Sequence, residues 1–417
     1  MTTTPQGPGV AYLVSRYPAL SHTFIEREVE ALRAEGVRVE TFTVRPAPSE
    51  TLLTETMRSE NARTKTLIGA GAPTWVTAHL DAIRRSPSAW FGTLSRSLRT
   101  GPLSPKSRLW QVFYFGEAGV LVHHMRRAGL RHVHAHFVNV ASDVARLAAD
   151  LGRRTDGPDA GWGWSFTMHG PTGFDAVREA DLAAKGHDAD GVMCISHYCR
   201  SQMMAELQPE DWDKLELVRM TVDADRYHPP ATPRQHDGSV RILTVGRLVP
   251  EKGPTLLLEA LRIVKDRGVD FAASLVGSGP LADELETRRR ELGLEDVVTL
   301  TGPIGQDRLP DMYREADIFA MASFQEGLPV VYMEALATEL PVVATAIAAT
   351  GELVVDDVTG RLIPPGDAVA LADALEDLAR NPEKRARLGR AGREAVVAQF
   401  TPATAGPAAA RFFDRGR

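Results

Sequence analysis

The chain has 417 residues, which exceeds the size of one ordinary hydrophobic core and favours two domains of about 200 residues each. Hydrophobic residues make up 43% of the sequence and charged residues 24%, as in globular enzymes, so a disordered chain is excluded. The formal net charge of −6 gives no overall positive field, so we expect no nucleic-acid partner and only local binding of anions.

The cysteine content and the first residues both indicate a cytoplasmic protein. Cys194 and Cys199 are the only cysteines, and a single close pair in so long a chain is typical of reduced thiols. The residues after Met1 lack the basic and apolar regions of a signal peptide. No run approaches the roughly 18 apolar residues of a membrane-spanning helix. We therefore expect neither secretion by that route nor a membrane span.

The first half of the chain opens with an expected strand at 10–14, a helix and a second strand at 37–44. The helix has Ile25, Val29 and Leu32 on one face. Residues 46–129 are less regular and are expected to form helices inserted before the next strand. Their scattered arginines fit solvated helix faces, and a basic amphipathic surface that contacts lipid is the alternative. Further strands are expected at 132–137, 164–168 and 191–195.

The proline-rich polar stretch at 228–239 is the best linker candidate in the chain. We expect an N-terminal domain at 1–230, a linker at 231–239 and a C-terminal domain at 240–400. In the second half, strands are expected at 241–245, 271–276, 297–300, 318–321 and 341–345, and helices at 255–266, 281–292, 309–315, 328–337 and 368–379. This alternation predicts an α/β fold with two Rossmann-like, doubly wound parallel sheets. The cleft between two such sheets is the expected ligand site.

Two loops in the second half suggest phosphate binding. Gly246 follows the strand at 241–245, and Arg247 and Lys252 then supply a planar guanidinium and a flexible ammonium, the groups that a diphosphate needs. A solvated basic loop explains the same residues equally well. Gly277 and Gly279 match a loose G-x-G-x-x-A pattern between a strand and a helix, which fits either a ligand contact or tight packing.

A pair of glutamates lies in the stretch 323–334. Glu326 falls in the loop after a strand and Glu334 in the next helix, about 12 Å apart if the eight intervening steps are largely helical. This distance is comparable to the span from a sugar hydroxyl across a diphosphate to a ribose. The helix N-terminus between them is suited to a phosphate. Without the other motifs, the better interpretation of the stretch is an amphipathic helix with one capping and one solvated carboxylate.

Histidines 132, 134 and 136 share one face of a strand, because side chains alternate with a period of two. Such a pattern also presents zinc ligands in metallohydrolases, with His169 as a further ligand. The chain lacks an ordered set of later Asp and His residues to complete that site. We therefore expect no metal here, and we expect His136 and His169 to contact a substrate. The two Asp-x-Asp patterns, at 188–190 and 223–225, are too short to indicate a metal.

Several further motifs occur together over nearly the whole chain. They include the stretches at 17–24, 134–137, 166–175, 195–200, 246–253, 277–280 and 358–366, and the Glu326/Glu334 pair, which forms an E-x7-E motif. In combination these motifs resemble the retaining glycosyltransferases of the GT-B fold, in the group often called family four, and within it the hexose-transferring branch of polysaccharide assembly.

The resemblance implies a donor site for a nucleotide-diphosphate sugar. Arg247 and Lys252 would bind the diphosphate, Glu326 the hydroxyls of the transferred sugar and Glu334 the ribose. The full expected donor set is Gly246, Arg247, Lys252, Gly277, Gly279, Pro303, Ile304, Glu326, Gly327, Leu328, Pro329 and Glu334. Arg247, Lys252, Glu326 and His136 are the expected catalytic residues, in a retaining, metal-independent reaction without a cofactor.

The resemblance also implies an acceptor site in the first domain. Its expected residues are Ser21, His22, Thr23, His136, His169, Asp175, Ser196 and Arg200. The acceptor is a saccharide, a lipid-linked intermediate or a small metabolite, so peripheral membrane contact is an option. The tail at 401–417 is expected to pack back on the first domain, anchored by Phe412 and Phe413.

Three other functions fit parts of the same pattern. The first is a metal-dependent hydrolase that uses His134, His136 and His169. The second is a nucleotide-sugar epimerase of the same fold, which needs no acceptor. The third is a nucleotide-binding protein without catalytic activity.

Overall fold

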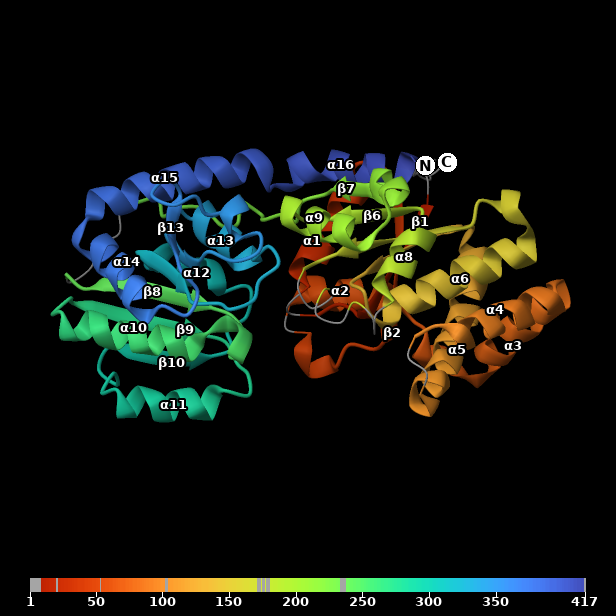
Figure 1. The fold of residues 1–417 in the computed structure, drawn as a ribbon, viewed down its shortest axis with the longest axis horizontal. Helices are drawn as coiled ribbons and strands as arrows, with labels where there is room; N and C mark the ends of the chain where they lie inside the picture. The colour runs from red at the N-terminus through yellow and green to blue at the C-terminus, as the bar shows by residue number, and fades with distance from the viewer. Residues whose placement is uncertain are drawn as a thin grey trace. The chain divides into compact units, whose positions relative to one another are not determined.

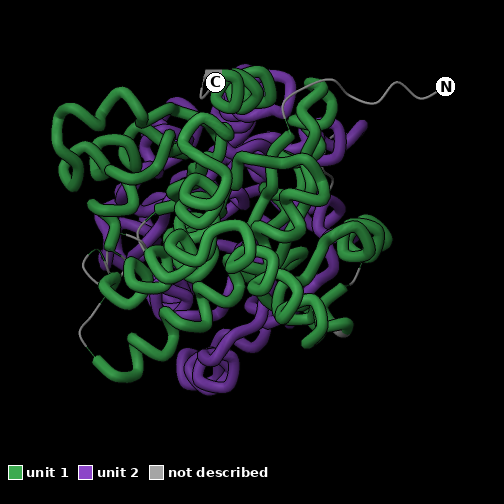
Figure 2. Tube along the Cα trace, turned by 90° about the vertical axis from the view of Figure 1, so that its right-hand side faces the viewer, with its two compact units in different colours: residues 1–219, 405–417 green, residues 220–404 purple. Residues whose placement is uncertain are grey.

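The computed structural model describes residues 9–19, 22–52, 54–101, 104–170, 174, 177, 181–232 and 238–415 (Figure 1). The chain divides into two compact units, each with its own parallel sheet. Unit 1 comprises Met1–Arg219 and Ala405–Arg417, and unit 2 comprises Met220–Thr404 (Figure 2).

The change from unit 1 to unit 2 comes earlier than the expected boundary at residue 230. The Val222 N–H donates to the Phe400 carbonyl at 2.8 Å, and the Tyr227 ring lies 5.5 Å from that of Tyr313, so this segment is anchored within unit 2. Of the expected linker at 231–239, residues 233–237 lie outside the described part of the chain. The composition identified the proline-rich loop. It did not show that the residues before this loop, such as the buried Val222 and Tyr227, already belong to the core of unit 2.

Unit 1 contains a seven-stranded sheet in the order β3-β2-β1-β4-β5-β6-β7, and all its paired strands are parallel. Its strands are β1 (Gly9–Arg16), β2 (Arg38–Arg45), β3 (Lys65–Thr66), β4 (His132–His136), β5 (Gly163–Met168), β6 (Gly191–Cys194) and β7 (Leu215–Leu217). Helices α1 (Thr23–Ala34), α6 (Val140–Asp156), α8 (Leu182–Asp188) and α9 (His197–Glu206) connect them. The five expected strands are confirmed. Strands β3 and β7 are too short to produce a periodic pattern.

The irregular stretch after β2 is confirmed as inserted helices. These are α2 (Glu55–Arg63), α3 (Gly71–Arg85), α4 (Pro87–Arg99) and α5 (Pro105–Ala128). Hydroxyl side chains cap three of them, because Thr54, Ser86 and Ser104 each accept an N–H from the first helical turn. Helix α5 ends at Gly129, whose φ of 68° is left-handed.

Unit 2 contains a six-stranded parallel sheet in the order β10-β9-β8-β11-β12-β13. Its strands are β8 (Val240–Val245), β9 (Phe271–Val276), β10 (Val298–Gly302), β11 (Ile318–Met321), β12 (Val342–Thr345) and β13 (Gly360–Ile363). Its helices are α10 (Pro254–Asp266), α11 (Ala282–Glu291), α12 (Leu309–Glu315), α13 (Val330–Ala337), α14 (Ala368–Arg380) and α15 (Pro382–Gln399). Every expected element of this half is confirmed, and β13 and α15 are additional.

The last helix, α16 (Pro402–Arg415), contributes to the core of unit 1. Phe412 and Phe413 are 7% and 6% exposed and pack with Val10, Tyr12 and Met193. A Cβ at position 191 would lie 2.8 Å from the Phe412 ring, so the glycine there makes room for it. Among the helices of the described residues, none combines the length and hydrophobicity needed to cross a bilayer.

Candidate functional site

The candidate donor site lies where the strand order of the unit 2 sheet reverses. Strand β8 comes first in this unit, yet it lies between β9 and β11. Loops that leave two such neighbouring strands diverge, which creates a binding crevice beyond their carboxyl ends. Gly246 and Arg247 directly follow β8, and the loop after β11 carries Ser323 and Glu326.

Glu326 is a buried carboxylate held by two donors. Lys252 Nζ donates to Glu326 Oε1 at 2.6 Å, and Ser323 Oγ donates to the same oxygen at 2.7 Å. The Glu326 side chain is only 4% exposed, whereas that of Lys252 is 24% exposed. Burial of a charge requires such pairing. The structure therefore brings together two of the expected catalytic residues and leaves the cation partly open to a ligand.

Arg247 is open to a ligand, whereas Gly277 and Gly279 serve the packing of neighbouring loops. Arg247 is exposed and has no ion pair within the described part of the chain. A Cβ at position 277 would lie 1.8 Å from the Gly246 carbonyl oxygen, and the Gly277 N–H already donates to Gly302. A Cβ at position 279 would lie 2.3 Å from the Leu248 carbonyl oxygen. Gly277 and Gly279 thus let neighbouring loops pass closely, which favours packing over phosphate contact for this turn.

Glu334 is held separately from Glu326. Its carboxylate accepts a hydrogen bond from the Tyr313 hydroxyl at 3.1 Å, and the residue is 3% exposed. Glu326 lies in the loop and Glu334 in the helix, as expected, but the stretch between them is only partly helical, because α13 begins at Val330 and residues 326–329 form a loop. Proline at 329 ends the loop as the helix N-cap.

The remaining expected donor residues lie in the loop that carries Glu326 or directly after the carboxyl end of another strand of the same sheet. Gly327, Leu328 and Pro329 belong to the loop between β11 and α13. Pro303 and Ile304 follow β10, the edge strand. Sequence reasoning did not assign roles to Ser323 and Tyr313. The serine had a signal, since a hydroxyl three residues before a loop carboxylate is within reach of it.

Three of the expected acceptor residues, His22, His136 and His169, gather near the corresponding reversal in unit 1, between β1 and β4. His136 ends β4, and His169 follows β5. His136 Nδ1 and His169 Nε2 lie 2.9 Å apart and form a hydrogen bond, in which one ring nitrogen donates and the other accepts. The Phe137 ring lies 4.5 Å from that of His169 and 5.3 Å from that of His22. Phe137 has a φ of 71°, a strained conformation for a bulky residue that turns the chain away at the strand end.

Burial keeps this histidine cluster neutral. It lowers the pKa of His134, His136 and His169 well below the usual value, and that of His22 to about 4. Neutral histidines can donate or accept a hydrogen bond, which suits contact with hydroxyl groups.

The other expected acceptor residues divide into three cases. Ser196 caps α9, since its Oγ accepts the Cys199 N–H at 3.0 Å. Thr23 begins α1, and Arg200 lies one turn into α9. Ser21 and Asp175 lie outside the described residues.

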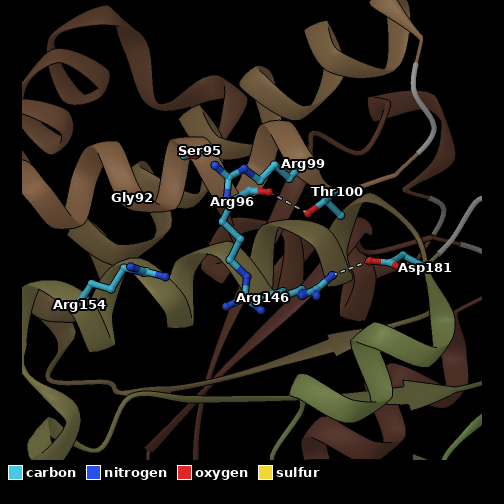
Figure 3. A pocket seen from close by; sticks show the side chains of 8 residues that line it. All are labelled: Gly92, Ser95, Arg96, Arg99, Thr100, Arg146, Arg154 and Asp181. Carbon is cyan, nitrogen blue, oxygen red and sulfur yellow. Dashed lines mark hydrogen bonds and ion pairs between the residues drawn. The ribbon is translucent and has the colours of Figure 1, made fainter.

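Unit 1 also has an arginine-lined pocket that sequence reasoning missed. Its volume is about 540 Å³, and its lining includes Arg96 and Arg99 from α4 and Arg146 and Arg154 from α6 (Figure 3). The arginines are widely spaced in sequence, so only the packing of α4 on α6 brings them together.

Glu28 is a second residue that sequence reasoning missed. It lies on the buried face of α1 set by Ile25, Val29 and Leu32, and that spacing was a usable signal. The Tyr12 hydroxyl donates to Glu28 Oε1 at 2.7 Å, and His136 Nε2 lies 3.6 Å from the same oxygen. Burial raises the pKa of Glu28 to about 7.

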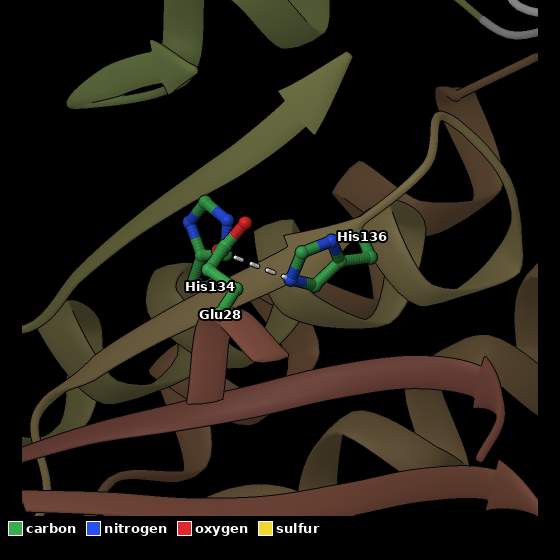
Figure 4. Close-up of side chains that lie close together, drawn as sticks. All are labelled: Glu28, His134 and His136. Carbon is green, nitrogen blue, oxygen red and sulfur yellow. Dashed lines mark ion pairs between the residues drawn. The ribbon is translucent and has the colours of Figure 1, made fainter. Parts of the chain in front are cut away.

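Glu28, His134 and His136 are close enough to consider as metal ligands, with one ligand atom each within 4.8 Å of the others (Figure 4). Both ring nitrogens of His134 are already engaged at 2.8 Å, one by Ser165 Oγ and one by Thr167 Oγ1. Ligation would break one of these buried hydrogen bonds. The donor set is therefore a poor fit to zinc, and His169 is committed to His136.

Comparisons with known proteins give a family match for residues 231–395 and a fold match for nearly the whole chain. Residues 231–395 match the family model described as "Glycosyl transferases group 1". A GDP-mannose-dependent alpha-(1-6)-phosphatidylinositol monomannoside mannosyltransferase of Mycolicibacterium smegmatis is 34% identical over 246 residues, 55% of this chain and 62% of the relative. The amylovoran biosynthesis glycosyltransferase AmsK of Erwinia amylovora is 34% identical over 194 residues, 45% of this chain and 47% of the relative. The matches thus span less than two thirds of these relatives.

Among solved structures, Anabaena Alr3699/HepE in complex with UDP superposes with a TM-score of 0.71. The match covers 98% of this chain and all of that one at 16% identity, so it concerns the fold. A glycosyltransferase from Rickettsia africae gives a TM-score of 0.70 at 15% identity over 98% of each chain. The chain therefore has the GT-B fold, and its residues 231–395 match the glycosyl transferases group 1 family model.

Proposed function

We propose that the protein is a retaining, metal-independent glycosyltransferase that takes its sugar from a nucleotide-diphosphate donor bound by unit 2. The observation that carries this proposal is the Lys252–Glu326–Ser323 group at the strand-order reversal of the family-matched unit. A buried carboxylate beside a partly exposed ammonium complements a ligand with hydroxyl groups at one end and a diphosphate at the other.

The chemistry follows from these charges. When the sugar leaves, negative charge grows on the diphosphate, and preorganised cations stabilise it. Lys252 and Arg247 are the cations of this site, and the N-terminus of α13 adds its positive dipole end. Glu326 would then accept hydrogen bonds from the transferred sugar and Glu334 from the ribose. Displacement of the Lys252 ammonium toward phosphate would leave Glu326 Oε1 with Ser323 as its donor and open a second acceptor position on that oxygen for a sugar hydroxyl.

The acceptor is proposed to bind unit 1 near His136 and His169, whose neutral rings suit a hydroxyl nucleophile. The relatives are named for a phosphatidylinositol mannoside and for the polysaccharide amylovoran. A lipid-linked or saccharide acceptor is therefore preferred to a small metabolite.

Donor binding is the first test of the proposal. The thermal unfolding midpoint of the purified chain should rise with one or more of GDP-mannose, UDP-glucose and ADP-glucose, and the rise should be lost in Arg247→Ala. Arg387→Ala is the matched control, because Arg387 is an exposed arginine of the same unit whose neighbour is Asp357. If no nucleotide or nucleotide sugar stabilises the protein, the proposal is wrong.

Product analysis by mass spectrometry then separates transfer from its alternatives. Transfer requires an added acceptor, and the anomeric configuration of the product reports retention. An isomerised nucleotide sugar formed without acceptor would indicate an epimerase. Activity abolished by a chelator and restored by zinc would favour the hydrolase. Nucleotide binding without turnover in any donor and acceptor combination would leave a binding protein.

A further inference from the structure

The inserted helices of unit 1 carry an unusual concentration of exposed apolar side chains. More than half of the exposed large apolar residues in the described part of the chain lie on α3, α4 and α5. They are Val76, Leu80, Phe91, Leu98, Leu109, Trp110, Val112 and Phe113. Four of them lie within residues 109–113 at the start of α5, where Trp110 is 42% and Phe113 is 51% exposed. An exposed apolar cluster of this kind marks an interaction surface.

The same helices are basic in a chain of negative net charge. Between Asp81 and Glu117 the sequence has no acidic residue and six basic ones, whereas the whole chain has a formal charge of −6. The six are Arg84, Arg85, Arg96, Arg99, Lys106 and Arg108. Arg99 and Lys106 are exposed, and neither has a carboxylate partner among the residues that the structure describes. Their positive charge is therefore available to an external anion.

One basic and three apolar residues lie along one stripe of α5. Lys106, Leu109, Trp110 and Phe113 recur at spacings of three and four, so they share one exposed face of the helix. The Trp110 and Phe113 rings lie 5.8 Å apart on that face. The Arg108 guanidinium donates to the carbonyls of Leu98 and Thr100, which holds the start of α5 beside the end of α4.

On α4 this apolar surface adjoins the arginine-lined pocket. Gly92, Ser95, Arg96 and Arg99 form the pocket stripe, and Phe91 and Leu98 lie about 100° around the helix from it. A Cβ at position 92 would lie 3.1 Å from an Arg154 nitrogen, so the glycine leaves room for that guanidinium across α4 (Figure 3).

The pocket keeps an excess of positive charge after its internal ion pairs are counted. Arg146 pairs with Asp181 at 2.8 Å, Arg154 with Asp150 at 2.8 Å, and Arg96 with Asp150 at 2.9 Å. Asp188 pairs with both Arg96 and Arg146, so three aspartates face four arginines. Arg99 joins these three arginines at the pocket without a carboxylate of its own in the described residues. Guanidinium groups are suited to phosphate because they donate two parallel hydrogen bonds.

We propose that the end of α4, the start of α5 and the arginine-lined pocket form a docking surface for an anionic phospholipid bilayer. Trp110, Leu109 and Phe113 enter the headgroup region, and Arg99 and Lys106 bind lipid phosphates. A soluble phosphate compound would use the pocket and leave the exposed aromatic stripe without a role. A protein partner that covers the stripe would leave the excess of cations unexplained. Only an anionic lipid surface would use both the exposed aromatic stripe and the excess of cations.

Vesicle sedimentation of the full chain tests this inference without using catalytic activity. The protein should sediment with vesicles of phosphatidylcholine and phosphatidylglycerol, and not with phosphatidylcholine alone, and 0.5 M salt should weaken binding. Arg99→Ala with Lys106→Ala should lower the apparent lipid affinity roughly 25-fold, at about fivefold for each cation. Arg290→Ala, which removes an exposed arginine of unit 2 (62% exposed), should leave lipid affinity unchanged.

Fluorescence shows whether Trp110 enters the lipid. Brominated lipids in the anionic vesicles should quench part of the tryptophan emission, and Trp110→Phe should remove that quenching while the variant still sediments. Three results would overturn the inference: no binding to anionic vesicles, binding that the double variant does not weaken, or self-association without lipid that Trp110→Ala abolishes. Binding of inositol hexakisphosphate at the pocket without vesicle binding would instead assign the site to a soluble phosphate.

Discussion

Lys252 is the residue on which the proposed chemistry depends most directly. Its side chain is 24% exposed, and its ammonium bonds a carboxylate that is almost fully buried, so the ammonium can turn toward a bound diphosphate without a large rearrangement. Ser323 then remains as the hydrogen-bond donor to Glu326. The ion pair thus holds a cation where the proposed reaction would develop negative charge.

Lys252→Ala is expected to lower kcat of sugar transfer by about 10²- to 10³-fold, the usual cost of removing one preorganised donor from a developing negative charge. The variant also leaves Glu326 without its cation, so its unfolding midpoint without ligand must be measured alongside. Arg387→Ala should keep full kcat. A Lys252→Ala enzyme that folds and retains wild-type turnover would contradict the role proposed for this ammonium.

Glu28 gives a pH-dependent prediction about stability. Its pKa is raised by burial from the ordinary 4.5 to about 7, so the folded state holds the proton more tightly than the unfolded state. Unit 1 therefore loses stability as pH rises from 4.5 to 7, and the full cost of the buried charge applies above pH 7. Glu28→Gln removes that charge and keeps an oxygen to accept the Tyr12 hydroxyl.

The unfolding midpoint of Glu28→Gln should therefore exceed that of the wild type by several degrees at pH 8, from a gain of up to about 3 kcal/mol. At pH 5 the two proteins should differ little, because Glu28 is already mostly protonated in the folded state. Glu30→Gln, on the exposed side of the same helix, serves as the control. Equal midpoints for Glu28→Gln and wild type at pH 8 would mean that this carboxylate is not destabilised by burial.

At this scale the sequence predicted the charged groups better than their partners. Lys252 and Glu326 lie far apart in the chain, yet both follow strands whose carboxyl ends meet, so their proximity could be expected. Tyr313 and Tyr12 could not be found this way. A buried tyrosine looks like any core aromatic until the packing of its helix or strand shows which carboxylate its hydroxyl meets.

At the scale of elements, the loop after β9 is constrained by its glycines. Gly277 has a φ of 148°, and a Cβ there would lie 1.8 Å from the Gly246 carbonyl oxygen of the neighbouring loop. That loop carries Arg247. The position of the arginine thus depends on the absence of a side chain one strand away.

Gly277→Ala is expected to destabilise unit 2 by roughly 2–4 kcal/mol, through backbone strain and the clash with the Gly246 carbonyl. Nucleotide affinity should fall as well, because the Gly246–Arg247 loop must move. Gly351→Ala is the matched control, since a Cβ there meets nothing within 4 Å and its φ is not left-handed. Unfolding midpoints and nucleotide titrations of both variants give the comparison, and identical behaviour would show that the loop has room.

Elements with long periodic patterns were predictable in both units, and the exceptions have physical causes. Strand β3 has two residues and β7 three, too few for any pattern. Helix α13 begins after its proline and not before it, because the chain first turns around the buried Glu326. The arginine-lined pocket could not be predicted, because nothing in the sequence of the inserted helices indicates that α4 packs on α6.

At the scale of the whole molecule, unit 1 depends on the end of the chain. Helix α16 supplies Phe413, whose ring lies 6.0 Å from that of Tyr12 and 5.3 Å from that of His134. These are residues of β1 and β4, the two strands at the reversal of the sheet. Helix α16 therefore supports the strands on which the proposed acceptor site lies.

Phe413→Ala should destabilise unit 1 by about 3–5 kcal/mol, the usual cost of removing a buried aromatic ring. The calorimetric transition that belongs to unit 1 should shift to lower temperature, while the nucleotide affinity of unit 2 should stay at the wild-type value, since unit 2 has its own core. Phe91→Ala removes a ring that is 62% exposed and should shift neither. A Phe413→Ala protein that loses nucleotide affinity at temperatures where unit 1 is still folded would show that α16 also acts on the donor site.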